Sequence, residues 1–268
     1  MNASLDLLID TFHSENLTGS PQQLHFFKNK YSMETSFRES KIKDERDHSF
    51  IYYNKDVLHV LWKNKAGAIQ FCGSAAYALA WVTSHHLKVP KIQIHSSHIQ
   101  LFSLYKSKQT YLEFSTVMPE RAKDFYNYKL YIDKSSGIFL LKFNSQKEIR
   151  NDQLIQRYLQ LLEQDFHQEI HGLCVFFWDQ KNLEGKLRYF TPWHGRDEDY
   201  VTGSIHRYLS PLIYELYKTT EQIWEQCSAS GGLLKSSLKN KFVKISGKCS
   251  TNTELDSIGF KKVLENYF

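Results

Sequence analysis

Residues 186–214, KLRYFTPWHGRDEDYVTGSIHRYLSPLIY, decide the fold of this chain. The side chains from Leu187 to Thr191 alternate in the way that predicts a strand, and Pro192 ends it. A compact charged loop follows. From Thr202 onward the apolar residues recur at helical spacing. We therefore expect a strand, a charged loop and a helix in direct succession.

The start of the predicted helix is a candidate anion-binding site. The hydroxyl groups of Thr202 and Ser204 can accept hydrogen bonds from free amides of the first turn, and Gly203 lets a ligand approach the backbone. These amides and the positive end of the helix dipole favour an anion. The acidic residues 197–199 come immediately before this point. The combination indicates acid/base chemistry beside an anion site.

The same pattern recurs in the first half of the chain. A glycine–serine pair and a following leucine, Gly73-Ser74 and Leu79, precede their counterparts by 130 residues. Residues 71–87 are apolar on every side of the predicted helix, which is typical of a buried helix. We interpret this echo as a diverged duplication. Two halves, each a curved sheet around a buried helix, would bring both helix starts to one cleft.

The segment 188–206 resembles the signature R-x-F-x-P-x-x-G-x-x-E-D-P-V-T-G-S-A-H of the phenazine biosynthesis PhzF-like family. Tyr200 replaces the usual proline and Ile205 the usual alanine. The resemblance implies an α+β chain with the pseudo-symmetric diaminopimelate-epimerase-like fold: two domains of mostly antiparallel sheet, with the site in the cleft between them. The matching positions are Arg188, Phe190, Pro192, Gly195, Glu198, Asp199, Val201, Thr202, Gly203, Ser204 and His206.

A second stretch carries the resemblance near the N-terminus. The segment Met33-Glu34-Thr35-Ser36-Phe37 resembles the family's S-E-T-A-F, in which the glutamate is the catalytic acid/base. The resemblance therefore implies this role for Glu34. Only 12 residues separate Pro21 from Glu34, whereas the family usually fits a fuller helix there, so the connection looks shortened.

The family's chemistry is proton abstraction from a carbon next to a carboxylate or carbonyl group, without metal or pyridoxal. The resemblance thus implies a cofactor-independent isomerase or epimerase that acts on a small anionic metabolite. Glu34 would carry the proton, with its pKa raised by burial in a closed cleft. Asp199 would orient the substrate or share the proton. The implied catalytic residues are Glu34, Asp199 and Ser204, and the implied substrate-binding residues are Gly73, Ser74, Thr202 and Gly203.

One departure leaves two alternatives open. The family commonly carries Gly-His-Ala-Thr at the first helix start, where this chain has Gly-Ser-Ala-Ala at residues 73–76. The histidine, a donor or proton relay, is missing. The chain could therefore be a catalytically degraded member that binds a small anionic metabolite. It could also be an interaction protein that keeps the scaffold for dimerisation.

Length and composition bound these interpretations. The 268 residues are enough for about two domains, which we place at 1–116 and 117–268, and 41% hydrophobic residues indicate a folded globular protein. The net charge of +5 is scattered, so nucleic acid is not expected as a partner. We expect no membrane segment and no signal peptide, a cytoplasmic location and a homodimer.

The cysteines and histidines offer weaker candidates. No two of the four cysteines have CxxC spacing, and Cys72 stands at a helix start, where the pKa of a thiol is lowered. The pairs His95–His98 and His167–His171 have ligand-like spacing, but a third ligand cannot be named. We therefore expect no metal, and we expect Cys72 to be a small buried residue. The lysines between 235 and 248 are expected to form a solvated face.

Overall fold

The structure is a computed structural model that describes residues 5–87, 90–96, 99–122, 124–166 and 170–251. In chain order its elements are β1 (Leu5–His13), β2 (Ser20–Phe27), α1 (Lys30–Glu39), β3 (Asp47–Asn54), β4 (Val57–Asn64), β5 (Gly67–Ile69), α2 (Gly73–Leu87), β6 (Lys91–His95), β7 (Gln100–Lys106), β8 (Gln109–Ser115), β9 (Glu120–Arg121), β10 (Lys129–Asp133), β11 (Ile138–Lys142), α3 (Gln146–Ile149), α4 (Asp152–Phe166), β12 (Gly172–Asp179), β13 (Glu184–Thr191), the 3₁₀-helix η2 (Pro192–His194), β14 (Arg196–Glu198), α5 (His206–Tyr217), β15 (Glu221–Gln226), β16 (Gly232–Lys239) and β17 (Phe242–Thr251).

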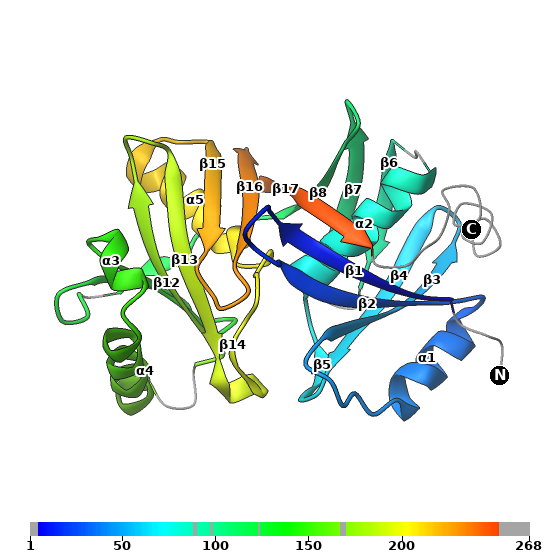
Figure 1. Cartoon of the computed structure of the whole chain (residues 1–268), viewed down its shortest axis with the longest axis horizontal. Coiled ribbons are helices and arrows are strands. Elements are labelled where there is room, and N and C mark those ends of the chain that lie inside the picture. Colours follow the sequence, from blue (N-terminus) through cyan, green and yellow to red (C-terminus); the bar gives the residue numbers. More distant parts are fainter. Residues whose placement is uncertain (1–4, 88–89, 97–98, 123, 167–169, 252–268) are drawn as a thin grey trace.

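The first half of the chain is a closed barrel around α2 (Figure 1). Strands β1, β2, β3, β4, β6, β7 and β8 are hydrogen-bonded in this order, and β17 closes the barrel between β8 and β1. Residues 73–80 of α2 are all buried. Alanines make up much of this stretch, and their small side chains let the helix fit inside the barrel. The predicted buried helix is thus confirmed.

The second half is a curved sheet around α5. Strands β10, β11, β12, β13, β15, β16 and β17 are neighbours in this order, and the short β9 pairs with β10. The inner face of α5 is buried, whereas Tyr214 on its outer face is 41% exposed. α4 lies outside the sheet, where Ile155, Tyr158 and Leu162 are buried in a separate apolar cluster. The predicted α+β fold with two curved sheets is confirmed.

The two halves repeat one order of elements. β2 and β3 pair in parallel across α1, as β11 and β12 do across α3 and α4. β4 and β6 pair in parallel across α2, as β13 and β15 do across α5. β3 and β12 therefore correspond to each other, and so do α2 and α5.

β17 belongs to both sheets, because it pairs with β16 on one side and with β1 and β8 in the barrel (Figure 1). The division of the chain at residues 116 and 117 remains a prediction. Among the helices that the structure describes, none combines the length and the apolar character needed to cross a membrane.

Candidate functional site at the junction of the two halves

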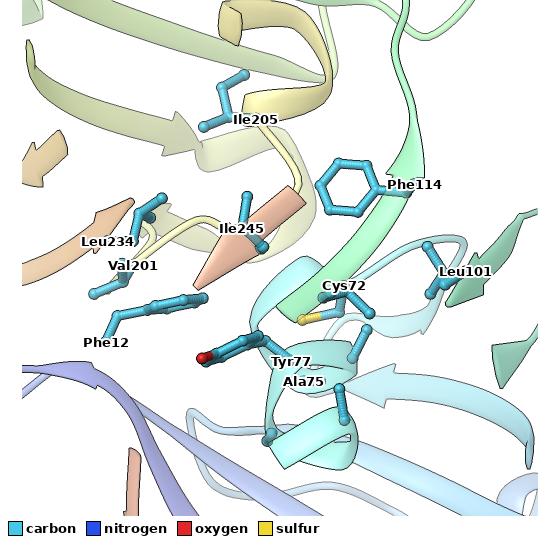
Figure 2. Packing of buried hydrophobic residues seen from close by; sticks show 14 of the residues in the cluster. Phe12, Cys72, Ala75, Tyr77, Leu101, Phe114, Val201, Ile205, Leu234 and Ile245 are labelled. Carbon is cyan, nitrogen blue, oxygen red and sulfur yellow. The ribbon is translucent and has the colours of Figure 1, made fainter. Parts of the chain in front are cut away.

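The starts of α2 and α5 touch each other. A Cβ atom built on Gly73 would lie 2.2 Å from the backbone nitrogen of Ser204, and one built on Gly203 would lie 2.9 Å from the carbonyl carbon of Gly73. Figure 2 shows Ile245 of β17 between Cys72 and Ile205, which flank these helix starts. The approach is possible only because both positions are glycines. The prediction that the two helix starts come together is confirmed by this contact, whereas the cleft expected between them remains a prediction.

Ser74 joins the two halves at this contact. Its hydroxyl donates a hydrogen bond of 2.5 Å to the carbonyl oxygen of Val201 and accepts one of 3.2 Å from the amide of Gly203. Ser74 is 3% exposed. Two of the groups that were predicted to hold an anion here, the hydroxyl of Ser74 and the amide of Gly203, are therefore engaged with each other across the junction.

Asp47 is the buried acid on the side of the first half. It is the first residue of β3 and is 6% exposed. The thiol of Cys72 donates a hydrogen bond of 3.3 Å to its Oδ2 atom. Burial raises the pKa of Asp47; nearby Arg196 acts in the opposite direction, and nearby Asp199 raises the pKa further. Asp47 is thus set up to hold a proton at a higher pH than an ordinary aspartate.

Arg196 bridges Asp47 to an acid of the second half. Its guanidinium lies 2.8 Å from Oδ1 of Asp199 and 3.4 Å from Oδ1 of Asp47, and it also donates to the carbonyl oxygen of Glu45. The three side chains are 13%, 17% and 8% exposed, in the order Arg196, Asp199 and Asp47. Gly195, with φ of 77°, makes the turn that brings Arg196 to this position.

The turn that carries Asp199 is held by hydrogen bonds on both sides. The hydroxyl of Thr202 donates to Oδ2 of Asp199 at 2.6 Å, so it does not cap α5. The side chain of Gln226 donates to the carbonyl oxygen of Asp199 at 2.8 Å and accepts from the amide of Thr202 at 2.7 Å. The role of Gln226 is not predictable from the sequence, because it depends on β15 lying beside this turn.

Glu34 does not lie with the other predicted site residues. It is on α1, which packs on the outer side of β2 and β3 at the edge of the first half (Figure 1). Its side chain is 39% exposed and its carboxylate lies 3.5 Å from the ammonium group of Lys30, one helical turn away. The expected burial in a closed cleft is therefore not observed. Of the predicted residues, the structure brings together Gly73, Ser74, Asp199, Thr202, Gly203 and Ser204.

A signal for Asp47 was present in the sequence. Asp47-His48-Ser49-Phe50 has an acid three residues before a phenylalanine, which is also the spacing in S-E-T-A-F. With Asp47 as the acid, α1 (Lys30–Glu39) fits between Pro21 and the acid. The connection that looked too short for Glu34 is then of ordinary length.

The structure corrects one expectation about Cys72. Burial raises the pKa of its thiol well above the ordinary value, and the negative charge of Asp47 raises it further. Both effects outweigh the helix start, which was expected to lower the pKa. Cys72 is 9% exposed and is a hydrogen-bond donor to Asp47, in line with the expectation of a small buried residue.

His206, the last residue of the signature, is fully buried at the start of α5. Its ring lies 5.6 Å from that of Trp224. Burial lowers the pKa of His206 to about 3, so the ring is neutral at physiological pH. This position contributes packing inside the second half.

The other histidine candidates give no metal site in the described ranges. His95 lies at the end of β6 and its ring contacts that of His59 edge-on at 5.6 Å, whereas His98 and His167 are outside the described residues. Within the described part of the chain, no group of three His, Cys, Asp or Glu side chains is arranged to hold a metal ion.

A cavity of about 430 Å³ lies between α4 and the segment from β13 to β14. Arg188 and Glu198 line it and form an ion pair of 2.7 Å. Asp47 and Asp199 are not among its lining residues. This cavity is therefore separate from the junction of the helix starts.

Two curved sheets whose central helices meet end to end define the class of this chain: it has the fold of the PhzF family proteins, as the resemblance implied. The crystal structure of a PhzF family protein from Enterococcus faecalis has a TM-score of 0.75 and 20% identity, and the match covers 94% of this chain and 98% of that chain. A putative phenazine biosynthesis PhzC/PhzF protein from Clostridium difficile has a TM-score of 0.73 and 22% identity, with the same coverage of both chains. An uncharacterized isomerase of Halalkalibacterium halodurans is 24% identical over 218 residues, which are 76% of this chain and 79% of that protein. The chain matches no protein-family model.

Proposed function

We propose that this chain is an isomerase that moves a proton on a carbon atom next to a carboxylate or carbonyl group of a small anionic metabolite, without metal or pyridoxal. One observation carries the proposal. Asp47 of the first half and Asp199 of the second half contact the same guanidinium, that of Arg196, where the two helix starts meet. The name of the curated relative, an isomerase, supports the same class of reaction.

In this proposal Asp47 is the acid/base, in place of Glu34. Burial raises the pKa of Asp47, and an acid/base is most effective when its pKa lies near the working pH. The thiol of Cys72 holds Oδ2, which leaves Oδ1 as the oxygen that faces Arg196. Asp47 would take the proton from the substrate carbon and return it to another carbon or to the other face.

Asp199 and Arg196 would orient the substrate. Guanidinium groups bind carboxylates in a forked geometry, and the contact of Arg196 with Asp47, at 3.4 Å, is longer than its contact with Asp199. A substrate carboxylate would exchange with Asp47 at the guanidinium and thereby free Asp47 to act. Ser204 remains the proposed hydrogen-bond donor to the substrate, while Ser74 and Gly203 hold the two halves together.

Hydrogen exchange with solvent tests the proposal. The full chain is incubated in D2O with a panel of amino and hydroxy acids, and deuterium incorporation next to the carboxylate is followed by proton NMR. Asp47→Asn keeps the size of the side chain but cannot carry the proton, so we expect exchange to fall by ~10²-fold or more. Glu34→Gln is the matched control on α1 and should leave exchange unchanged.

The opposite pattern, loss of exchange in Glu34→Gln but not in Asp47→Asn, would restore the role that the sequence resemblance implied for Glu34. A wild-type chain that binds one of these acids but exchanges none of them would favour the catalytically degraded alternative.

A further inference from the structure

Four side chains form a continuous hydrogen-bonded row on the outer side of the first barrel. His25 Nδ1 lies 2.7 Å from Oδ1 of Asp6 on β1, and His25 Nε2 lies 2.9 Å from Nδ1 of His48 on β3. His48 Nε2 lies 3.1 Å from Oδ1 of Asp44, in the loop before β3. The row therefore reads carboxylate, imidazole, imidazole, carboxylate, and each of its three contacts has hydrogen-bond length.

The row fixes the number of ring hydrogens. A carboxylate only accepts hydrogen bonds, so both outer contacts require an N–H group on the histidine. The central contact joins two ring nitrogens and requires one hydrogen between them. Three ring hydrogens are thus needed, whereas two neutral imidazoles carry only two. All three contacts can be hydrogen bonds at the same time only when the pair of rings holds one extra proton and one positive charge.

The surroundings place this charge on His25. Burial lowers the pKa of His48, and Asp44 offsets this only in part. His25 has the shorter contact with a carboxylate, and the ring of Phe50 lies 5.0 Å from it. His25 would therefore carry both ring hydrogens, and His48 would be neutral, with its hydrogen on Nε2 pointing to Asp44. Among the described residues, the charged groups around the two rings are Asp6, Asp44 and Arg46.

The same row holds the loop that ends at Asp47. Asp44 accepts from Nε2 of His48, from the guanidinium of Arg46 at 2.7 Å and from the amide of Arg46 at 2.9 Å. Arg46 also donates to the side chain of Gln23 on β2, at 3.0 Å. Asp47 follows directly and its side chain points to the opposite side of β3, toward the junction. The loop is thus fixed from outside the barrel just before the buried acid.

We propose that His25 and His48 share one extra proton and, through Asp44 and Arg46, act as positioning residues for Asp47. The role assigned to Asp47 rests on the proposed function, whereas the shared proton does not. While the proton is present, all three contacts of the row are hydrogen bonds and the 44–47 loop is held. When it is lost, one contact must break and the loop loosens.

Ring-nitrogen NMR tests the shared proton. The 15N shifts of the uniformly labelled full chain are recorded from about pH 6 to about pH 8, the range in which an ordinary histidine titrates. We expect two protonated nitrogens on His25, and on His48 one protonated nitrogen and one hydrogen-bond acceptor. Asp6→Asn removes the negative charge beside His25, so the signals of the extra proton should be weaker in this variant than in the wild-type chain at the same pH. Two neutral rings throughout this range in the wild-type chain would overturn the proposal.

The positioning role has its own readouts. His48→Gln should speed exchange of the Arg46 amide about tenfold, because Asp44 is no longer held in place. It should also lower the midpoint of the Asp47 titration, followed by its 13Cγ shift, since a looser loop admits water. His59→Gln is the matched control: that ring lies on β4 and contacts Tyr52 and His95 instead.

Equal effects of His48→Gln and His59→Gln, or no effect of His48→Gln, would refute the positioning role. None of these readouts measures turnover. A chain that shows the shared proton and the coupled titration, but has no exchange activity that depends on Asp47, would refute the proposed function alone.

Discussion

The corresponding strand starts of the two halves differ in the group that they bring to the junction. β3 begins with Asp47, whereas β12 begins with Gly172. A Cβ atom built on Gly172 would lie 2.2 Å from the hydroxyl of Tyr189, so a phenol from β13 fills the place of a side chain there. The second half therefore brings its acid, Asp199, from the turn after β14. The two halves share one arrangement of elements and differ in where the buried acid comes from.

The residues just before the two helix starts are both hydrogen-bond donors, but they differ in strength. The residue before the glycine is Cys72 in the first half and Thr202 in the second. Each donates to the acid of its own half: Cys72 to Asp47 at 3.3 Å and Thr202 to Asp199 at 2.6 Å. A thiol is the weaker donor. The donor to Asp47 is therefore the weaker of the two, which fits the proposed role of Asp47 as the proton carrier.

Substitutions of the glycines at the two helix starts should give the largest difference in stability between the two halves. Alanine at position 73 would place Cβ 2.2 Å from the backbone nitrogen of Ser204, and backbone cannot move aside as a side chain can. We expect Gly73→Ala to lower the free energy of unfolding by about 3 kcal/mol. Gly203→Ala has closest contacts of 2.9 and 3.0 Å and should lower it by about 1 kcal/mol. Urea unfolding of both variants measures the difference, and equal values would mean that the junction is not closely packed.

The serines that follow these glycines should differ as well. Ser74→Ala removes an acceptor from the amide of Gly203 and a donor from the carbonyl group of Val201, both at the buried junction. An unsatisfied buried polar group destabilises by about 1–3 kcal/mol, so we expect about 2 kcal/mol for this variant. Ser204→Ala, at the matched position, should change the free energy of unfolding by less than about 0.5 kcal/mol. A Ser204 variant as unstable as the Ser74 variant would contradict the asymmetry.

Local pattern predicted the fold well. The strand that ends before Pro192 and the helix that follows the acidic loop are β13 and α5, because alternation and helical spacing reflect burial of one face. The short echo between residues 73–79 and 203–209 was enough to predict that the two halves repeat one arrangement. The echo has a physical cause, because two helices can touch end to end only where Cβ atoms are absent.

The acid of the first half could not be placed by pattern alone. Glu34 matched the family motif over more residues than Asp47 did, but it lies on the exposed face of a helix that pattern analysis had not predicted. Burial beside Cys72 and Arg196 distinguishes Asp47, and that burial arises from strand pairing between distant segments. The role of Arg196 could not be predicted for the same reason. The sequence places it in a charged loop, and only the fold shows that its guanidinium contacts two acids.

The smallest expected effect concerns the thiol of Cys72, which donates to Asp47, and it appears in the pH dependence of stability. The pKa of Asp47 is raised by burial, so the folded chain binds this proton more tightly than the unfolded chain does. As pH rises above about 4, where an unfolded aspartate titrates, this group makes the free energy of unfolding fall until Asp47 itself is deprotonated.

Cys72→Ser provides a stronger donor to the carboxylate, lowers the pKa of Asp47 and should make this fall shallower, by less than about 1 kcal/mol. Cys174→Ser is the matched control, because Cys174 is also a buried cysteine but lies on β12 in the second half. Urea unfolding at a series of pH values compares the three chains. If both serine variants keep the wild-type slope, the thiol of Cys72 does not set the pKa of Asp47, and the difference between the two helix starts has no consequence for the acids.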